Sequence, residues 1–165
     1  MTARAPRSTG LWDWAVAVHQ APGVDAALIE IQDQHGQCTS FLLWAAWAAM
    51  TGRTLSPADL ARGAALAGPW EREVTAPVRA ARRALKRDWP GVDGGPREAL
   101  RGRVKAAEIE AEERLLEALE ALAPAPSAAA GDAAAAMIAA SAAWGVPAPE
   151  PALRRLALMF ETADS

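Results

Sequence analysis

The longest uninterrupted apolar stretch of the chain is residues 41–50, which read Phe-Leu-Leu-Trp-Ala-Ala-Trp-Ala-Ala-Met. A helix that is apolar on every face must be enclosed on all sides. Ten residues at about 1.5 Å of rise span roughly 15 Å, half of the roughly 30 Å that a bilayer core requires. The stretch therefore predicts the buried centre of a helical core, rich in tryptophan, and no insertion into a membrane.

Elsewhere, apolar residues recur at helical spacings of three and four, and no stretch alternates with the period of two that is typical of strands. Ser8 or Thr9 is expected to cap the first helix, Pro22 to open the second, Thr39 or Ser40 to cap the third and Ser56 the fourth. The pattern predicts helices over residues 11–20, 22–35, 40–52, 57–67, 70–85, 96–121, 132–144 and 149–162, with a kink or a late start at Pro77. The predicted fold class is an all-α, single globular multi-helix domain, with helix 40–52 at its centre and helices 11–20, 22–35, 70–85 and 96–121 around it.

An alanine- and proline-rich stretch after residue 123 suggests a boundary in the chain. The predicted organisation is a flexible N-terminus over 1–10, a helical core domain over 11–123, an Ala/Pro linker over 124–130 and C-terminal helices over 131–165 that dock on the core. On this basis residues 1–123 are expected to fold without the rest.

Composition adds information about the cellular setting. The chain has 165 residues, a formal net charge of −3 and one cysteine, Cys38, so an internal disulfide is excluded. Residues 1–10 lack the apolar core of a signal peptide. Both observations predict a cytoplasmic protein.

The net charge conceals two opposite blocks. Residues 72–105 hold ten basic and four acidic side chains, and residues 106–120 hold six glutamates and one arginine. Two helices with these charges would neutralise each other, with Glu108 and Glu112 as the first partners expected for the basic helix. The alternative is that the basic face near 79–87 contacts nucleic-acid phosphates, which the acidic balance of the whole chain disfavours.

Two polar positions, Gln32 and Asp33, face the end of the expected core. Buried polar groups without partners cost about 1–3 kcal/mol, so this pair needs partners, and an arginine would bind Asp33 through two hydrogen bonds. Internal pairing is favoured over solvent exposure or a ligand-binding role. The possible functional polar cluster comprises Gln32, Asp33, Arg79, Arg82 and Arg83.

A second group of polar residues consists of Glu30, Asp33, His35 and Cys38. These residue types occur in the active sites of thiol enzymes and in metal sites. A thiolate nucleophile needs a base within about 3 Å. His35 points away from Asp33 on an ideal helix, and Cys38 directly precedes the buried helix, so a structural role is favoured for both. No metal or cofactor site is predicted, and an enzymatic role is left open but disfavoured.

Seven tryptophans occur in a chain without tyrosine. Trp44 and Trp47 belong to the apolar run and are expected in the core. Tryptophan is enriched at interface hot spots, so Trp12, Trp70 and Trp89, which lie near expected helix ends or loops, are possible interaction anchors, although burial is favoured for them too.

Several motifs together resemble a known family: Leu11-Trp-Asp-Trp14, Pro22-Gly-Val24, residues 28–36 with Gln32-Asp33, Phe41-Leu-Leu43 with Trp47, residues 78–86 and residues 105–112. The chain resembles an uncharacterised family of short proteobacterial proteins, domain of unknown function 2390, over about residues 11–120. The family pattern has an aromatic near His19 and an asparagine near Cys38, so neither residue inherits a role. The resemblance implies a fold and no mechanism.

These observations predict a non-enzymatic cytoplasmic interaction or accessory protein with a protein partner. A nucleic-acid-associated protein that uses the helix near 79–87 is the alternative, and a small enzyme around Asp33, His35 and Cys38 is the third. An apolar or tryptophan-bearing patch left exposed would favour the first, and a concave pocket at the three polar residues would favour the third.

Overall fold

A computed structural model describes residues 10–163, and over this range the chain folds into helices without strands. The all-α class predicted from the sequence is confirmed. The elements are α1 (Leu11–His19), α2 (Val24–His35), α3 (Thr39–Met50), α4 (Pro57–Trp70), the π-helical turn η1 (Glu71–Thr75), α5 (Ala76–Leu85), α6 (Gly94–Leu122), α7 (Ala133–Trp144) and α8 (Glu150–Ala163).

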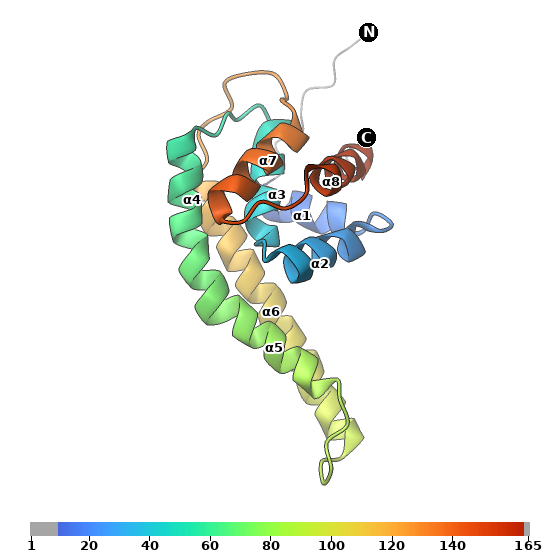
Figure 1. Cartoon of the computed structure of the whole chain (residues 1–165). Coiled ribbons are helices and arrows are strands. Elements are labelled where there is room, and N and C mark those ends of the chain that lie inside the picture. Colours follow the sequence, from blue (N-terminus) through green and yellow to red (C-terminus); the bar gives the residue numbers. More distant parts are fainter. Residues whose placement is uncertain (1–9, 164–165) are drawn as a thin grey trace.

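Helix α3 lies at the centre of the molecule, as its apolar sequence predicts (Figure 1). The side chains of Phe41, Leu42, Trp44 and Trp47 are at most 1% exposed. Helix α7 packs along α3, and α1, α2, α4 and α6 complete its surroundings. No helix in residues 10–163 is both long and apolar enough to cross a membrane.

The C-terminal helices contribute fully buried side chains to this core. Met137 of α7 and Leu153 and Phe160 of α8 are completely buried, and the Phe160 ring meets Trp14 of α1 edge-on at 5.4 Å. The segment that joins α6 to α7 is also fixed, because the amides of Ser127 and Gly131 donate to carbonyls at the end of α3. Helices α1–α4, α7, α8 and the C-terminal half of α6 thus form one packed unit, which we call the body.

Gly52 explains how the segment after α6 can lie so close to α3. Its φ is +75°, and a Cβ at this position would lie 2.2 Å from the carbonyl oxygen of Ala128. Only glycine adopts this backbone conformation freely while leaving room for the crossing chain. The glycine predicted as the end of helix 40–52 therefore also fixes the path of the C-terminal region.

The predicted boundary between helices 57–67 and 70–85 is wrong. Helix α4 continues through η1 directly into α5, and Pro69 and Pro77 both lie within this continuous helical path (Figure 1). In η1 the amide of Ala76 donates to the carbonyl of Glu71, five residues earlier. A π turn inserts one residue into the helix, and here it takes the place of the expected kink at Pro77.

The expectation that helix 70–85 packs around the central helix is also wrong. Helix α5 packs against α6 and η1 instead. Together α5 and residues 94–108 of α6 extend away from the body, which Figure 1 shows as a long pair of helices with the loop 86–93 at its tip. We call this pair the arm.

The ends of the helices differ in detail from the expected caps. Ser56 caps α4, as predicted, and the structure shows that it does so in a capping box with Asp59. Helix α2 begins at Val24 after a left-handed Gly23 rather than at Pro22, α6 begins at Gly94 rather than Pro96, and Cys38 rather than Thr39 or Ser40 is the N-cap of α3. The predicted caps Ser8 and Thr9, and nearly all of the N-terminus predicted as flexible, lie outside the described residues.

Candidate functional site: a groove between α1, α2 and α6

Three helices present stripes of residues, spaced by three and four, to one common cavity of about 600 Å³. Because such residues share a helix face, each helix contributes one wall, and the N-terminal end of α3 closes the inner side. We call this cavity the groove. Its walls are Trp12, Ala15, Val16 and His19 of α1, Asp25, Leu28, Ile29 and Gln32 of α2, and Lys105, Glu108, Ile109, Glu112 and Leu116 of α6, with Thr39, Ser40 and Leu43 of α3 and Arg79, Arg82 and Arg83 of α5.

Aliphatic side chains on the walls remain open to solvent. Val16, Ile29 and Ile109, one from each wall helix, are 39%, 52% and 43% exposed. Trp12 lies beside them and is partly buried. The groove therefore combines apolar walls with a small number of polar groups, which is the usual composition of a binding site.

The inner end of the groove borders an ion-pair network centred on Arg79. Its guanidinium lies 2.8 Å from Glu71, 3.3 Å from Glu108 and 3.8 Å from Glu112, and the arginine is buried. In an unbroken α-helix, residues seven apart share a face, whereas Glu71 and Arg79 are eight apart. The extra residue of η1 restores the alignment, so the π turn brings Glu71 and Arg79 to the same side of the helix.

Two further arginines of α5 have acidic partners. Arg82 binds Glu108 through its guanidinium. Arg83 binds both carboxylate oxygens of Asp33 at 3.1 and 2.9 Å, and the Gln32 amide donates to Asp33 at 3.2 Å. Both hydrogen bonds of Arg83 come from one guanidinium nitrogen, Nη2, which lies between the two oxygens of Asp33.

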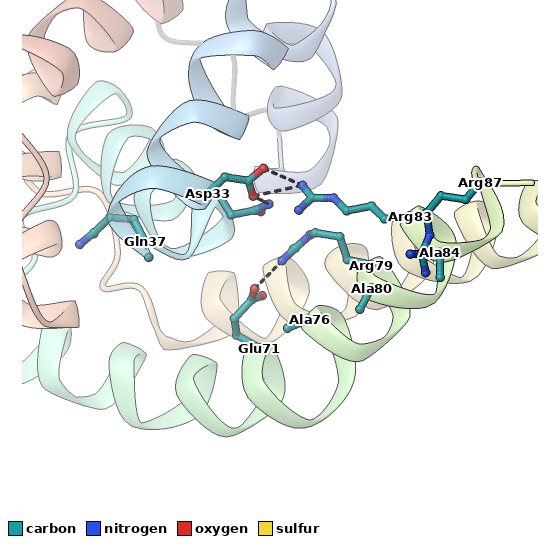
Figure 2. A pocket seen from close by; sticks show the side chains of 11 residues that line it. Asp33, Gln37, Glu71, Ala76, Arg79, Ala80, Arg83, Ala84 and Arg87 are labelled. Atoms are coloured by element: carbon teal, nitrogen blue, oxygen red, sulfur yellow. Dashed lines mark hydrogen bonds and ion pairs between the residues drawn. The ribbon is translucent and has the colours of Figure 1, made fainter.

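The Arg83–Asp33 pair joins α2 to α5 and lies between the groove and a second cavity of about 660 Å³ (Figure 2). In Figure 2, Arg83 reaches from α5 to Asp33 on α2, while Arg79 turns toward Glu71. Gln32, Arg79 and Arg83 line both cavities. These three side chains therefore separate the groove from the second cavity.

Glu112 differs from its acidic neighbours in lacking a close cation, since its nearest ion pair is the 3.8 Å contact with Arg79. Burial of the carboxyl, followed by the neighbouring charge of Glu108, raises the pKa of Glu112 to about 7, whereas Arg79 acts in the opposite direction. At Asp33, burial acts to raise the pKa, but the hydrogen bonds from Gln32 and Arg83 and the charges of Arg83 and Arg79 together outweigh it and lower the pKa, so the ionised form is favoured.

The structure thus brings together Gln32, Asp33, Arg79, Arg82 and Arg83, and the pairing of the basic helix with Glu108 agrees with the charge pattern of the sequence. A functional role for this cluster remains a prediction.

The group around Cys38 is dispersed. Glu30 lies 4.0 Å from Arg155 of α8, and Asp33 is bound by Arg83. Cys38 is 2% exposed, and burial raises the pKa of its thiol to about 12, which disfavours a thiolate. Between residues 10 and 163, no three histidine, cysteine, aspartate or glutamate residues are placed to hold a metal ion.

The three tryptophans expected as anchors occupy different settings. Trp12 lines the groove. Trp70 is partly buried and donates from its indole nitrogen to the carbonyl of Ala111 at 3.0 Å, which ties the helical path before η1 to α6. Trp89 is 44% exposed at the tip of the arm, where its indole donates to the carbonyl of Ala84.

Sequence reasoning missed the groove residues Val16, Ile29, Ile109 and Ser40, and considered Glu112 only as a partner for arginine. The sequence did contain a pattern that most of these residues share. Residues 12, 16 and 19, residues 25, 29 and 32, and residues 105, 109 and 112 each follow a spacing of four and then three. The spacing alone did not indicate that the three stripes face each other.

The fold and the groove define an all-α protein with an amphipathic cleft between three helices. The chain belongs to the family DUF2390, described as proteins of unknown function, whose pattern matches residues 10–119, from the N-cap of α1 nearly to the end of α6. The match confirms the family resemblance. A search of the curated proteins gives no match, and neither does a search of the solved structures.

Proposed function

We propose that this protein is a non-enzymatic interaction protein that binds an amphipathic helical segment of a partner protein in the groove. The observation that carries this proposal is the convergence of exposed aliphatic side chains from three separate helices, Val16, Ile29 and Ile109, on one cavity. A monomer gains nothing from leaving these groups in water, whereas a partner that covers them gains about 25 cal/mol for each Å² of apolar surface removed from solvent.

The shape and composition of the groove support a helical occupant. An amphipathic helix that lies in a groove inserts anchor side chains at spacings of three and four. The groove runs along two turns of α1 and α2 and along three turns of α6, with Trp12 at its side. A partly buried tryptophan beside exposed aliphatic groups is typical of the centre of an interface.

Two other functions receive less support. The buried Cys38 thiol, held neutral by its raised pKa, has no hydrogen bond to His35 in the described part of the chain, so the enzyme alternative lacks its nucleophile. The nucleic-acid alternative requires free cations near 79–87, but three of the five basic side chains there, Arg79, Arg82 and Arg83, are engaged by acidic side chains. A cytoplasmic location agrees with a single reduced cysteine and forms part of the proposal.

Site-specific photo-crosslinking in cells that produce the protein tests the proposal. A photoreactive residue at Val16 is expected to crosslink a partner, and the crosslink is expected to disappear in the double variant Ile29→Asp/Ile109→Asp. Val92 and Leu100 lie in the arm and are 53% and 41% exposed, so Val92→Asp/Leu100→Asp is the matched control and should leave the crosslink intact. Crosslinking that both double variants reduce equally, or that neither reduces, would overturn the proposal.

Filter binding to DNA and RNA tests the nucleic-acid alternative. It is done at about 0.15 M salt, because contacts to phosphates depend steeply on salt. We expect no micromolar binding. Micromolar binding that is lost in a folded Arg82→Glu/Arg83→Glu variant would replace the proposed function by the nucleic-acid one.

A further inference from the structure

The ion-pair network beside the groove has an unequal number of charges. Three glutamates, Glu71, Glu108 and Glu112, surround two arginines, Arg79 and Arg82. Arg82 binds Glu108, and Arg79 makes its closest contact with Glu71, so the contact of Glu112 at 3.8 Å is the weakest of the network. Glu112 is therefore the carboxylate of the network with the weakest contact to a cation.

Glu112 lies where a bound segment would contact it. It follows the buried Ala111 on α6, its side chain is 31% exposed, and it lines the groove between Ile109 and Leu116 on the same helix face. The partly buried carboxylate thus borders the aliphatic walls on which the proposed partner would pack.

The other charged groups around Glu112 do not supply a closer cation. His19 of α1 faces it, but the His19 ring lies 2.5 Å from Asp25 of α2, which offsets any positive charge on the imidazole. Glu71 of η1 and Glu108 of α6 add negative charge. Lys105 is two turns earlier on α6, about 10 Å along the helix axis.

We propose that the groove selects a partner segment that carries a basic side chain among apolar ones, and that this basic group binds the carboxylate of Glu112 while its neighbours pack on Val16, Ile29 and Ile109. This inference rests on the proposed function, because it specifies the chemistry of the segment that the groove accepts. A lysine or arginine at this position equalises the charges of the network. An acidic side chain would instead meet Glu112 and Glu108.

Binding of a cation at Glu112 is linked to the protonation of this carboxyl. The cation favours the ionised form, so it lowers the pKa of Glu112 from about 7, and binding releases a proton when the pH is near or below that value. Affinity for a basic segment therefore rises as the pH increases from 6 to 8. A wholly apolar segment would show no such dependence.

Selection from a displayed library of amphipathic helical peptides, with one variable position within the apolar face, tests the inference. The full chain is used as bait at pH 8 in three forms: the natural sequence, Glu112→Gln, and Ile29→Asp/Ile109→Asp. Gln preserves the size of the side chain and removes its charge. Circular dichroism of each form establishes that it is folded before selection.

The natural sequence is expected to enrich peptides with lysine or arginine at the variable position. Its preference for a selected lysine peptide over the same peptide with norleucine should be about tenfold at pH 8, the size of a charge-assisted contact, and smaller at pH 6. Glu112→Gln should bind both peptides equally at both pH values. The Ile29→Asp/Ile109→Asp form should bind neither.

The remaining outcomes separate the two proposals. Enrichment of apolar peptides without a basic preference, abolished by Ile29→Asp/Ile109→Asp, would overturn the role of Glu112 and leave the proposed function in place. A preference for basic peptides that persists in the Glu112→Gln form would also overturn the role of Glu112 and leave the proposed function in place. Peptides that bind the Ile29→Asp/Ile109→Asp form unchanged, or no enrichment at all, would overturn both.

Discussion

The body and the arm of this protein are stabilised by different interactions. Around α3 the buried side chains are almost all apolar, including the fully enclosed Phe41, Trp44 and Phe160. Where α5 meets α6, the buried residues include Arg79 and Glu108, and the two helices are joined by ion pairs. The groove lies between the two regions and takes its aliphatic walls from the body and its arginines from the arm, while Glu112 comes from the part of α6 that belongs to the body.

The comparison of the body with the arm indicates that different kinds of interaction provide the stability of the fold and the selectivity of the groove. Apolar burial is non-directional and supplies most of the free energy of folding. A buried ion pair gains little net stability, because the removal of two charges from water offsets their attraction, but it places those charges in fixed positions. In this protein the body is expected to set the stability, and the arm to set the charge pattern presented to the groove.

Removal of residues 124–165 is the strongest test of the body, and we expect the largest loss of stability from it. Although the alanine- and proline-rich boundary led to the expectation that residues 1–123 fold alone, the packing of α7 along α3 and of Phe160 against Trp14 now leads us to expect the opposite. Circular dichroism and thermal unfolding of the truncated chain decide between the two. A cooperative unfolding transition in the truncated chain would show that α7 and α8 are dispensable.

Trp47→Ala examines a single position of the body. Trp47 is 1% exposed on the central helix, and the loss of a large aromatic side chain from a core costs about 3–5 kcal/mol. Urea denaturation at two ionic strengths should give this loss in the free energy of unfolding, equally at low and high salt. A loss below about 1 kcal/mol would contradict the central position of α3.

Arg79→Met examines the arm in the same way. Methionine keeps much of the volume of the side chain but leaves Glu71 and Glu108 close together, so we expect a loss of about 3 kcal/mol, the usual result when one partner of a buried ion pair is removed. The double variant Glu71→Gln/Arg79→Met should recover part of this loss. The absence of any recovery would mean that Arg79 acts through packing alone.

Glu112→Gln should change the pH dependence of stability. The pKa of this carboxyl is raised from 4.5 to about 7 in the folded protein, so the folded state binds the proton more tightly and the natural chain loses stability as the pH rises from 4.5 to 7. Above pH 7 the variant should be more stable by up to about 3 kcal/mol, and below pH 4.5 the two proteins should be alike. Unfolding of both proteins between pH 4 and 8 checks this, and parallel curves would contradict the shifted pKa.

The smallest effect is expected at the pair between Arg83 and Asp33. Both side chains are more than a third exposed, at 46% and 38%, and exposed ion pairs contribute about 0–1 kcal/mol. Arg83→Gln should therefore change the free energy of unfolding by less than about 1 kcal/mol, with the difference shrinking in high salt. A loss as large as that of Arg79→Met would show that the pair is a main connection between α2 and α5.

Local sequence signals predicted those features that depend on neighbouring residues. The apolar run 41–50 indicated a buried helix, and Ser56 followed by Pro57 indicated a capped helix start. The opposite charge blocks indicated the pairing of Arg79 and Arg82 with Glu108. In each case the determinant is a short pattern whose physical meaning does not depend on the rest of the chain.

The sequence by itself thus determined that the chain is helical, which helix is buried and which charges attract each other. The tertiary structure alone decided that α4 and α5 form one helical path, because packing against α6 and a π turn overcame the helix-breaking tendency of Pro69 and Pro77. It also decided that Val16, Ile29, Ile109 and Glu112 share a groove. Their association depends on how α1, α2 and α6 cross in space, and side chains that are distant in sequence meet only once that packing is formed.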